Sequence, residues 1–357
     1  MKMSFLLLCS AVSIAFGEKL LHFMERSIFQ KSFAFKERSL PQISHELIFL
    51  ITYKSLPKLQ SILDQVSDPY SKQYRNWLTS DQVRPLVHNP TGIMAVSQWL
   101  KEFGIEISRQ SIHGEVIVAT APIGLWESLL NATFYNCHDS RRGRKVRRLH
   151  RSPEYWIPLH LKPYVSAVFN TVQIPPLVNS FHKSAYSIVD EIAGKTLQNP
   201  FPNSAAAVPV TIRFLNNLYN VDSNIGDPAV TQSVVETADE SYSPVDLQQF
   251  QRVYNLTQQK AININGHNIS DCSSASNFCE GGNRDIQYIM GMAQATTSIY
   301  WYSSYESMDP FLLWILTMAD TKNPPSSNSI SWGAPEQVMK LLCTEDFLMF
   351  GLICSTL

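Results

Sequence analysis

The stretch Cys279-Glu280-Gly281-Gly282-Asn283-Arg284-Asp285-Ile286-Gln287-Tyr288-Ile289-Met290-Gly291-Met292-Ala293 decides the fold of this chain. Its apolar residues Ile286, Ile289, Met290 and Ala293 recur at the spacing of one helix face. The β-branched and aromatic residues 296–302 then predict a strand, residues 311–319 a second helix, and residues 328–333 a second strand. This order predicts a β-α-β crossover in a parallel sheet with helices packed on its faces.

Length and charge narrow the class of protein. The chain has 357 residues, more than one typical domain, and its 29 Lys and Arg against 30 Asp and Glu leave a formal net charge of -1. That balance gives no argument for binding nucleic acid or an anionic membrane surface. The apolar content of 45% is ordinary for a globular protein.

The first 17 residues have the pattern of a secretory signal peptide. A basic start at Lys2 precedes the apolar run 5–15, and Ala15 and Gly17 occupy positions -3 and -1 of a cut before Glu18. A buried first helix is the alternative, but the run has no amphipathic period. Further on, no apolar run approaches the roughly 20 residues that a membrane span needs. We expect a secretory-pathway protein with no membrane span.

Secretion gives meaning to the cysteines and to the Asn-X-Ser/Thr triplets. Five cysteines remain after the signal peptide, and Cys272 and Cys279 are close enough in sequence to close a small disulfide loop. A metal site is less favoured, because no CxxC and no nearby histidine pair occurs. Triplets at Asn131, Asn255 and Asn268 are consistent with a glycoprotein.

The remaining chain divides into three parts. Residues 18–178 form a predicted α+β unit, residues 179–208 a Pro- and Ala-containing linker, and residues 209–357 the part that holds the opening stretch. Within the first part the patterns predict elements in the order β-α-α-β-β-α-β, at residues 45–51, 59–66, 92–103, 106–111, 115–120, 125–130 and 132–137. The basic run 141–151 is either a solvated hairpin loop, which we favour, or a processing site.

Three motifs in order carry a resemblance to a known family. An acidic helix start runs into Asp285-Ile286-Gln287-Tyr288-Ile289-Met290, then comes Thr296-Thr297 with Trp301, and then Ser329-Ile330-Ser331-Trp332-Gly333 with Glu336. Together they resemble the sedolisin (serine-carboxyl peptidase) family, and within it the lysosomal tripeptidyl peptidases. The segment Ser67-Asp68-Pro69-Tyr70-Ser71-Lys72-Gln73-Tyr74 is similar to the prodomain of that family. The resemblance covers nearly the whole chain after the signal peptide.

The resemblance implies a fold and an activity. It implies a ferredoxin-like prodomain, an activation linker with a maturation cut, and the N-terminal part of a subtilisin-like α/β peptidase domain with a parallel sheet. In the family a glutamate, oriented by an aspartate, activates a serine nucleophile, and a second, protonated aspartate serves as the oxyanion donor. A carboxylate acts as a base only while ionised, so the expected activity is acid proteolysis of peptides or proteins, in a lysosome or outside the cell.

Two residues are the candidates for the catalytic carboxylates. Asp285 matches the motif aspartate, and Glu280 is the nearest glutamate before it. The family spacing E-x-x-x-D places both side chains on one helix face, whereas five positions turn a regular helix by about 500° and separate them. Glu280 therefore fits only if the glycines 281–282 bulge before the helix begins, and a solvated loop residue is an equally good interpretation.

The last motif supplies the candidate substrate-binding residues Ser331, Trp332 and Gly333. In the family this strand holds the extended peptide by β-augmentation; the alternative is an ordinary buried strand end. We also expect an apolar sheet edge at Ile299-Tyr300-Trp301, and for that reason instability of residues 206–357 on their own.

Several family features are not found in these 357 residues. No Gly-Thr-Ser and no Ser-Gly-Asp occurs, so the nucleophile and the oxyanion aspartate are missing, and the calcium site of the family would lie beyond residue 357. We therefore expect no cofactor here and no peptide hydrolysis by the chain as written. The alternatives are a non-catalytic secreted prodomain-type inhibitor or binder of an intact relative, and a gene-model fragment of a longer product.

Overall fold

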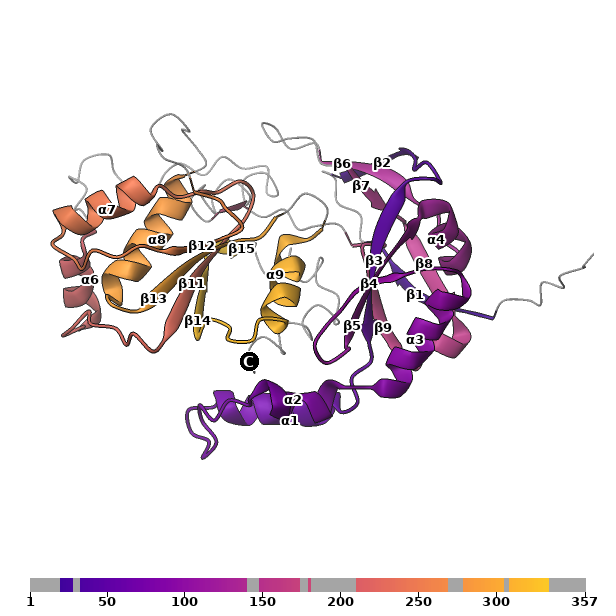
Figure 1. Cartoon of the computed structure of the whole chain (residues 1–357), viewed down its shortest axis with the longest axis horizontal. Helices are drawn as coiled ribbons and strands as arrows, with labels where there is room; N and C mark the ends of the chain where they lie inside the picture. Colours follow the sequence, from indigo (N-terminus) through magenta and orange to yellow (C-terminus); the bar gives the residue numbers. More distant parts are fainter. Residues whose placement is uncertain are drawn as a thin grey trace, which may run out of the picture.

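The structure is a computed structural model that describes residues 20–27, 33–139, 148–173, 179–180, 210–268, 279–304 and 308–333. The predicted signal peptide and most of the predicted linker lie outside these residues. The described chain forms two units, an α+β unit from residues 20–173 and an α/β unit from residues 210–333, with α9 (Pro310–Ala319) between their sheets (Figure 1).

The first unit is built on a four-stranded antiparallel sheet of order β4-β5-β3-β9. Its strands are β3 (Ser44–Ile51), β4 (Ile107–Gln110), β5 (Val116–Pro122) and β9 (Val165–Phe169). The helices are α1 (Leu56–Ser67), α2 (Ser80–Val87), α3 (Pro90–Glu102) and α4 (Ile123–Leu130). Helices between the first and second and between the third and fourth strands give the ferredoxin-like arrangement expected from the sequence.

Smaller sheets flank this core. β1 (Leu21–Arg26) pairs with β8 (Glu154–Pro158), and β6 (Tyr135–Asp139) lies between β2 (Phe33–Arg38) and β7 (Arg148–Arg151). A short 3-10 turn, η1 (Leu159–Leu161), precedes β9. The expectation for residues 132–137 is therefore corrected. That segment contributes to β6, outside the main sheet, and β9 closes the main sheet, because the β6–β7–β8 excursion intervenes in the chain.

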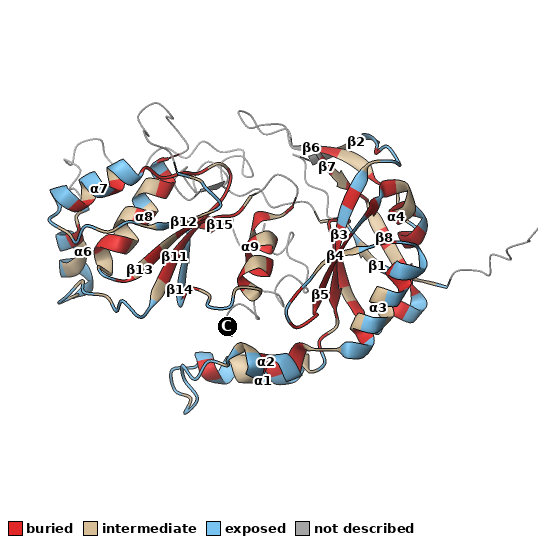
Figure 2. Cartoon of the chain, in the orientation of Figure 1, coloured by how far each residue is buried: buried red, intermediate tan, exposed pale blue. Residues whose placement is uncertain are grey.

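Alternate residues of the main sheet face two different cores. Phe49 of β3, Ile117 of β5 and Val168 of β9 face α3 and α4 in one cluster, whereas Ile48 and Val118 belong to a second cluster. The period of two places successive side chains on opposite faces, and both faces are buried here (Figure 2). Unlike a one-sided antiparallel sheet, this unit therefore needs a cover on each face.

The second unit contains a parallel sheet of order β12-β13-β11-β14. Its strands are β11 (Thr231–Glu236), β12 (Ile262–Ile264), β13 (Thr297–Tyr302) and β14 (Ser327–Ile330), and its further helices are α6 (Ile212–Tyr219), α7 (Pro244–Val253) and α8 (Glu280–Met292). The predicted crossover is present. β13 leads through α9 to β14, and β11 lies between the two strands.

The helices cover opposite faces of this sheet. Val234 and Tyr300 pack with Ile286 and Met290 of α8, whereas Val235 shares a cluster with the residues of α9. The apolar side chains of α9, among them Leu312 and Leu316, lie in the same cluster as Ile48, Val118 and Phe169 of the first unit. Helix α9 therefore joins the two units through a shared core.

The expectation that Ile299-Tyr300-Trp301 form an apolar edge of the sheet is wrong. These residues belong to β13, which lies between β12 and β11, and the side chains of Tyr300 and Trp301 are buried. The strand at one edge of the sheet is β14, whose residues Ser327–Ile330 are all exposed and mostly polar. Such a polar edge resists unwanted pairing better than an apolar one.

Candidate functional site

The candidate site lies where β11 ends. Glu236 is the last residue of β11 and is only 1% exposed. Two positions beyond Val234 on the same strand, it faces α8, and its carboxylate lies beside that of Asp285 on that helix. The indole Nε1 of Trp332 donates to Glu236 Oε2 at 2.7 Å. β11, α8 and β15 (Trp332–Gly333) thus bring a glutamate, an aspartate and an indole together.

The neighbouring carboxylate favours the protonated form of Glu236. A second negative charge beside Asp285 is costly in a buried site, because like charges repel. Burial, and next the charge of Asp285, raise the pKa of Glu236 well above its usual value. The Trp332 indole opposes this shift by donating to the ionised form. Glu236 therefore keeps its proton under conditions in which exposed carboxylates have lost theirs.

Two more groups complete a buried cluster with this pair. Glu240, on the turn that follows β11, accepts from the backbone N–H of Gly282 at 3.3 Å. The hydroxyl of Tyr300, on β13, is fully buried and would lie 2.5 Å from a Cβ added at Gly282. Burial, followed by the charges of Glu236, Glu240 and Asp285, raises the pKa of Tyr300 well above 10, so its hydroxyl stays protonated.

Glu280 lies away from this cluster. Helix α8 is continuous from Glu280 to Met292, and Asn283 N–H already donates to Cys279 O at 3.0 Å, so no bulge interrupts residues 281–282. The side chain of Glu280 is 76% exposed and pairs with Arg284 at 3.0 Å. The structure brings Asp285 to the carboxylate cluster and leaves Glu280 on the solvent side, as a regular helix requires at a spacing of five residues.

The candidate substrate strand is paired with the chain's own linker. Trp332 and Gly333 form β15, which pairs antiparallel with β10 (Asn179–Ser180), the segment just after the first unit. Ser331 lies between β14 and β15. Two residues from the beginning of the predicted linker thus add a strand to the segment for which the motif predicts peptide binding.

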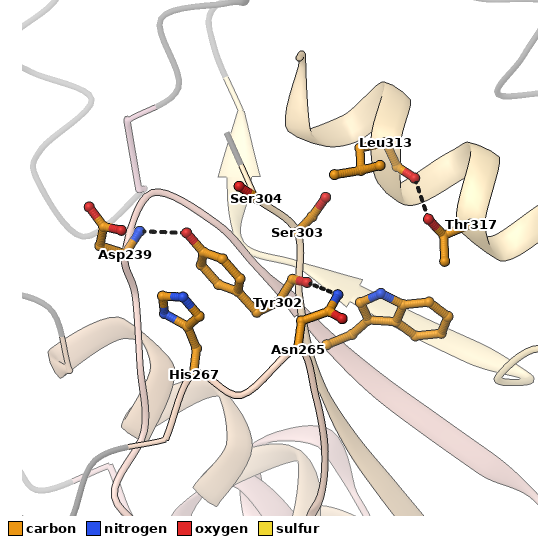
Figure 3. A pocket seen from close by; sticks show the side chains of 9 residues that line it. Asp239, Asn265, His267, Tyr302, Ser303, Ser304, Leu313 and Thr317 are labelled. Atoms are coloured by element: carbon orange, nitrogen blue, oxygen red, sulfur yellow. Dashed lines mark hydrogen bonds between the residues drawn. The ribbon is translucent and has the colours of Figure 1, made fainter. Parts of the chain in front are cut away.

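A pocket of about 520 Å³ opens at the same end of the sheet (Figure 3). Its lining comes from the end of β13, from the residues that follow β11, β12 and β13, and from α9. The aromatic side of the pocket is the ring of His267, stacked on Tyr302 with 3.3 Å between centroids. Tyr302 Oη accepts from the backbone N–H of Asp239 at 3.2 Å. The carboxyl ends of parallel strands are where ligands bind in such sheets.

The other predicted residues are placed as follows. Asn131, Asn255 and Asn268 are all exposed, as glycosylation requires. Cys279 is disulfide-bonded, and Cys272 lies outside the described residues, as do residues 141–147 of the basic run. Arg151, which ends that run, is buried and donates to the backbone oxygens of Gln173 and His150. In the described residues no group of three or more metal-ligating side chains occurs, and no helix is long and apolar enough to cross a membrane.

Glu236 and Glu240 are the site residues that motif matching missed. Both lie in the segment 234–240, in which no residue was singled out from the sequence. The signal that could have found Glu236 is its place: a carboxylate directly after the apolar pair Val234-Val235 stands at the carboxyl end of a buried strand, facing the helix that carries Asp285.

Comparison with known proteins supports the family resemblance. Residues 31–174 match the family model described as "Pro-kumamolisin, activation domain". The chain is 26% identical over 306 residues to tripeptidyl-peptidase 1 of Macaca fascicularis and to that of Homo sapiens, and 24% identical over 314 residues to that of Mus musculus. These matches cover 83–84% of this chain and 51–52% of the relatives, so the chain spans about half the length of the curated relatives it matches. The predicted resemblance to the sedolisin family is confirmed.

Proposed function

We propose that this chain, which resembles the sedolisins from its prodomain to the Ser-Trp-Gly strand, forms the pro-region and the carboxylate-bearing part of a serine-type peptidase that acts on peptides in acid. The observation that carries the proposal is the pairing of Asn179–Ser180 with Trp332–Gly333. A strand that binds an extended peptide is held by a segment of the same chain, as in a zymogen whose pro-region occupies the substrate site.

The carboxylate network supports chemistry in acid. The raised pKa of Glu236 lets the site accept or release a proton at a pH where exposed carboxylates are already ionised. Trp332 links this network to the peptide strand, since its indole bonds Glu236 while its backbone lies in β15. In this role Asp285 is the motif aspartate, and Glu236 holds it in place.

Hydrolysis also needs a nucleophile and an oxyanion donor. Neither Gly-Thr-Ser nor Ser-Gly-Asp occurs in residues 1–357. We therefore propose that these residues alone bind peptide without turning it over, because without the serine and the donor little rate enhancement remains. The leader pattern and the three exposed Asn-X-Ser/Thr sites support a secretory route, to a lysosome or out of the cell.

Peptide binding tests this proposal. A specific protease site introduced within residues 193–200 allows the linker to be cut in the purified chain. We expect a fluorescent hexapeptide to bind the cut chain at acid pH, and the uncut chain much more weakly. After the cut β10 is attached at one end only, so a peptide can displace it from β15 while the first unit stays on α9. Absence of binding by the cut chain would contradict a peptide site. A fluorogenic tripeptide amide should not be hydrolysed, and turnover that Asp285→Asn abolishes would show that a nucleophile lies within these residues.

A second function is favoured by the first unit. Residues 31–174 have a core of their own, with Trp126, Phe134 and Tyr155 fully buried, and they also present an apolar face to α9. Such a unit could cover the equivalent helix of an intact relative as an inhibitor in trans. Residues 18–178, added at micromolar concentration to an active tripeptidyl-peptidase 1, should then slow hydrolysis of a tripeptide amide. Full activity at that concentration would rule out this second function.

A further inference from the structure

We propose that Glu240, on the turn after β11, is a positioning carboxylate of this site. It supplies the acidic group that the family spacing E-x-x-x-D would place on α8, four residues before Asp285. The inference rests on the proposed function, because it names the second acidic partner of Asp285 in that chemistry. It is independent of where the nucleophile comes from.

Helix α8 itself lacks a carboxylate at the expected place. The residue four positions before Asp285 is Gly281, which is buried and has no side chain. Glu280 is one residue earlier, turned by about 100° on the helix, and engaged with Arg284 on the solvent side. Helix α8 therefore supplies no second carboxylate to the cluster, and any such group comes from another element.

The turn after β11 brings Glu240 to that place. Glu240 is 7% exposed, and its Oε2 accepts the backbone N–H of Gly282, in the first turn of α8. Ala238 and Asp239 both have positive φ, 56° and 67°, and Glu240 N–H donates to Thr237 O at 3.0 Å. Two successive non-glycine residues in this conformation are uncommon, and the reversal they make sends the chain back against the helix.

The glycines of α8 make this approach possible. A Cβ at Gly282 would lie 2.2 Å from the carbonyl oxygen of Ser241 and 2.5 Å from the Tyr300 hydroxyl. No side chain larger than hydrogen fits between the turn and the helix at this point. The absence of a carboxylate four residues before Asp285 and the position of Glu240 therefore both belong to the close packing of this turn against α8.

The charge of Glu240 acts on the groups that Asp285 also affects. Glu236 on β11 and Tyr300 on β13 both respond to Glu240 and to Asp285. The remaining polar groups around the cluster are Tyr242 on the same turn, the Trp332 indole on β15, and the first-turn N–H groups of α8. A helix N-terminus favours an ionised acceptor, and the charge of Glu240 raises the pKa of Glu236. Glu240 thereby helps to set the pH at which Glu236 loses its proton.

The Trp332 indole reports this proton directly. The full chain is labelled with 5-fluorotryptophan, the Trp332 signal is assigned with Trp332→Phe, and its ¹⁹F shift is followed from about pH 3 to 8. Glu240→Gln keeps an acceptor for Gly282 N–H but removes the charge. We expect this variant to lower the midpoint by about one pH unit, a tenfold change in proton affinity. The control Glu280→Gln, on the exposed side of α8, should leave the midpoint unchanged.

A second variant keeps the test possible if Glu240→Gln does not fold. If Glu240→Gln does not give the dispersed ¹⁹F spectrum of the folded chain, Glu240→Asp is measured instead; its shorter, charged side chain withdraws from Gly282, and a smaller downward shift is expected. A midpoint equal to that of the unsubstituted chain in the folded variant would overturn the proposal, as would a larger shift in Glu280→Gln. No peptide is present, so failure of peptide binding and failure of this inference are separate results.

Discussion

At the scale of single residues, the site depends on a contact that only glycine permits. Gly282 lies in the first turn of α8, where the turn after β11 approaches the helix most closely. Its backbone N–H bonds Glu240, and the Tyr300 hydroxyl lies beside it. Alanine is a better helix former than glycine by about 1 kcal/mol, so an ordinary helix would gain stability from the exchange. At Gly282 the clash of an added Cβ destabilises the chain by more than this gain in helix propensity.

We therefore expect Gly282→Ala to destabilise the chain by about 1–3 kcal/mol, the usual cost of forcing extra volume into a packed site. The matched control is Gly291→Ala in the same helix. Its added Cβ would meet the flexible end of the Ile212 side chain, which can move, and would make an ordinary contact with Leu256 Cδ1 at 3.4 Å. Urea unfolding of both variants measures the difference. An equal or smaller loss in Gly282→Ala would mean that the turn is not held against α8.

Acid should weaken the first unit through His45. This side chain is buried, and its Nε2–H donates to Asn170 O at 2.9 Å. Burial, and then the charge of Arg151, lowers the pKa of His45 from 6.5 to about 3. The unfolded chain thus binds a proton that the folded chain rejects between those values. The stabilisation is complete above pH 6.5 and is lost as the pH falls toward 3, by about 1.4 kcal/mol for each pH unit.

His45→Gln isolates this contribution. Glutamine keeps a donor for Asn170 O and does not titrate. We expect its unfolding free energy to fall less steeply than that of the unsubstituted chain between pH 6 and about 4, as followed by urea unfolding with tryptophan fluorescence. Parallel curves would show that His45 does not contribute to acid sensitivity.

At the scale of elements, α9 joins the two units. Residues on one face of the β3–β5–β9 sheet, such as Val118, pack in the same cluster as Leu312 and Leu316 of the helix. Polar contacts lie at the end of the helix, where Asp320 Oδ1 accepts from Ile112 N–H at 3.2 Å and Oδ2 lies 3.9 Å from Arg109 Nε. The apolar contact is the larger contribution, because partly exposed ion pairs add little.

Variants of two neighbouring residues of β5 distinguish the docking of the first unit on α9 from the folding of that unit. Ile117 faces the unit's own core and Val118 faces the cluster with α9, and both are buried. We expect Ile117→Asp to unfold the first unit, since a charge in a closed core is uncompensated. Val118→Asp should leave the unit folded but unable to stay bound once the linker is cut. Circular dichroism and gel filtration of the cut chain distinguish these outcomes, and identical behaviour of the two variants would contradict the two-sided sheet.

Helices and strands with strong periodicity were predicted well from the sequence. α3, α9, β5 and β13 lie within one or two residues of their predicted ranges. The two strands β1 and β2 were missed, and α2 was too, since Pro85 interrupts its pattern. Strand order could not be predicted, because pairing depends on packing between distant segments. That is why β13 was expected at an edge and β9 was not expected in the main sheet.

The site was predictable only in part, for a physical reason. Asp285 belongs to a local motif on one helix, so its sequence neighbours identify it. Glu236 and Glu240 join it through the fold, across a parallel sheet and a tight turn, and no local pattern shows such proximity. The position of Glu280 also required the structure, since the sequence permits either a bulge or a regular helix at residues 281–282.

At the scale of the whole molecule, each unit buries apolar surface that the other unit would expose to water if it were alone. The first unit shields the face of α9, and its following segment, β10, pairs with β15. We expect residues 206–357 expressed alone to aggregate or to be partly disordered, because α9 would present a large apolar face to water. Co-expression with residues 18–178 should restore solubility. A soluble, monomeric 206–357 fragment with a cooperative unfolding transition would show that α9 needs no cover.

The central claim is that the strand at Trp332–Gly333 is a peptide site that the chain's own linker occupies. Amide hydrogen exchange at residues 331–333, measured by mass spectrometry in acid, tests it most directly. We predict strong protection in the intact chain, rapid exchange after the linker is cut, and protection restored by an added extended peptide, since main-chain hydrogen bonds to β15 would be made, lost and made again. Unchanged protection after the cut, with no response to peptide, would contradict the account.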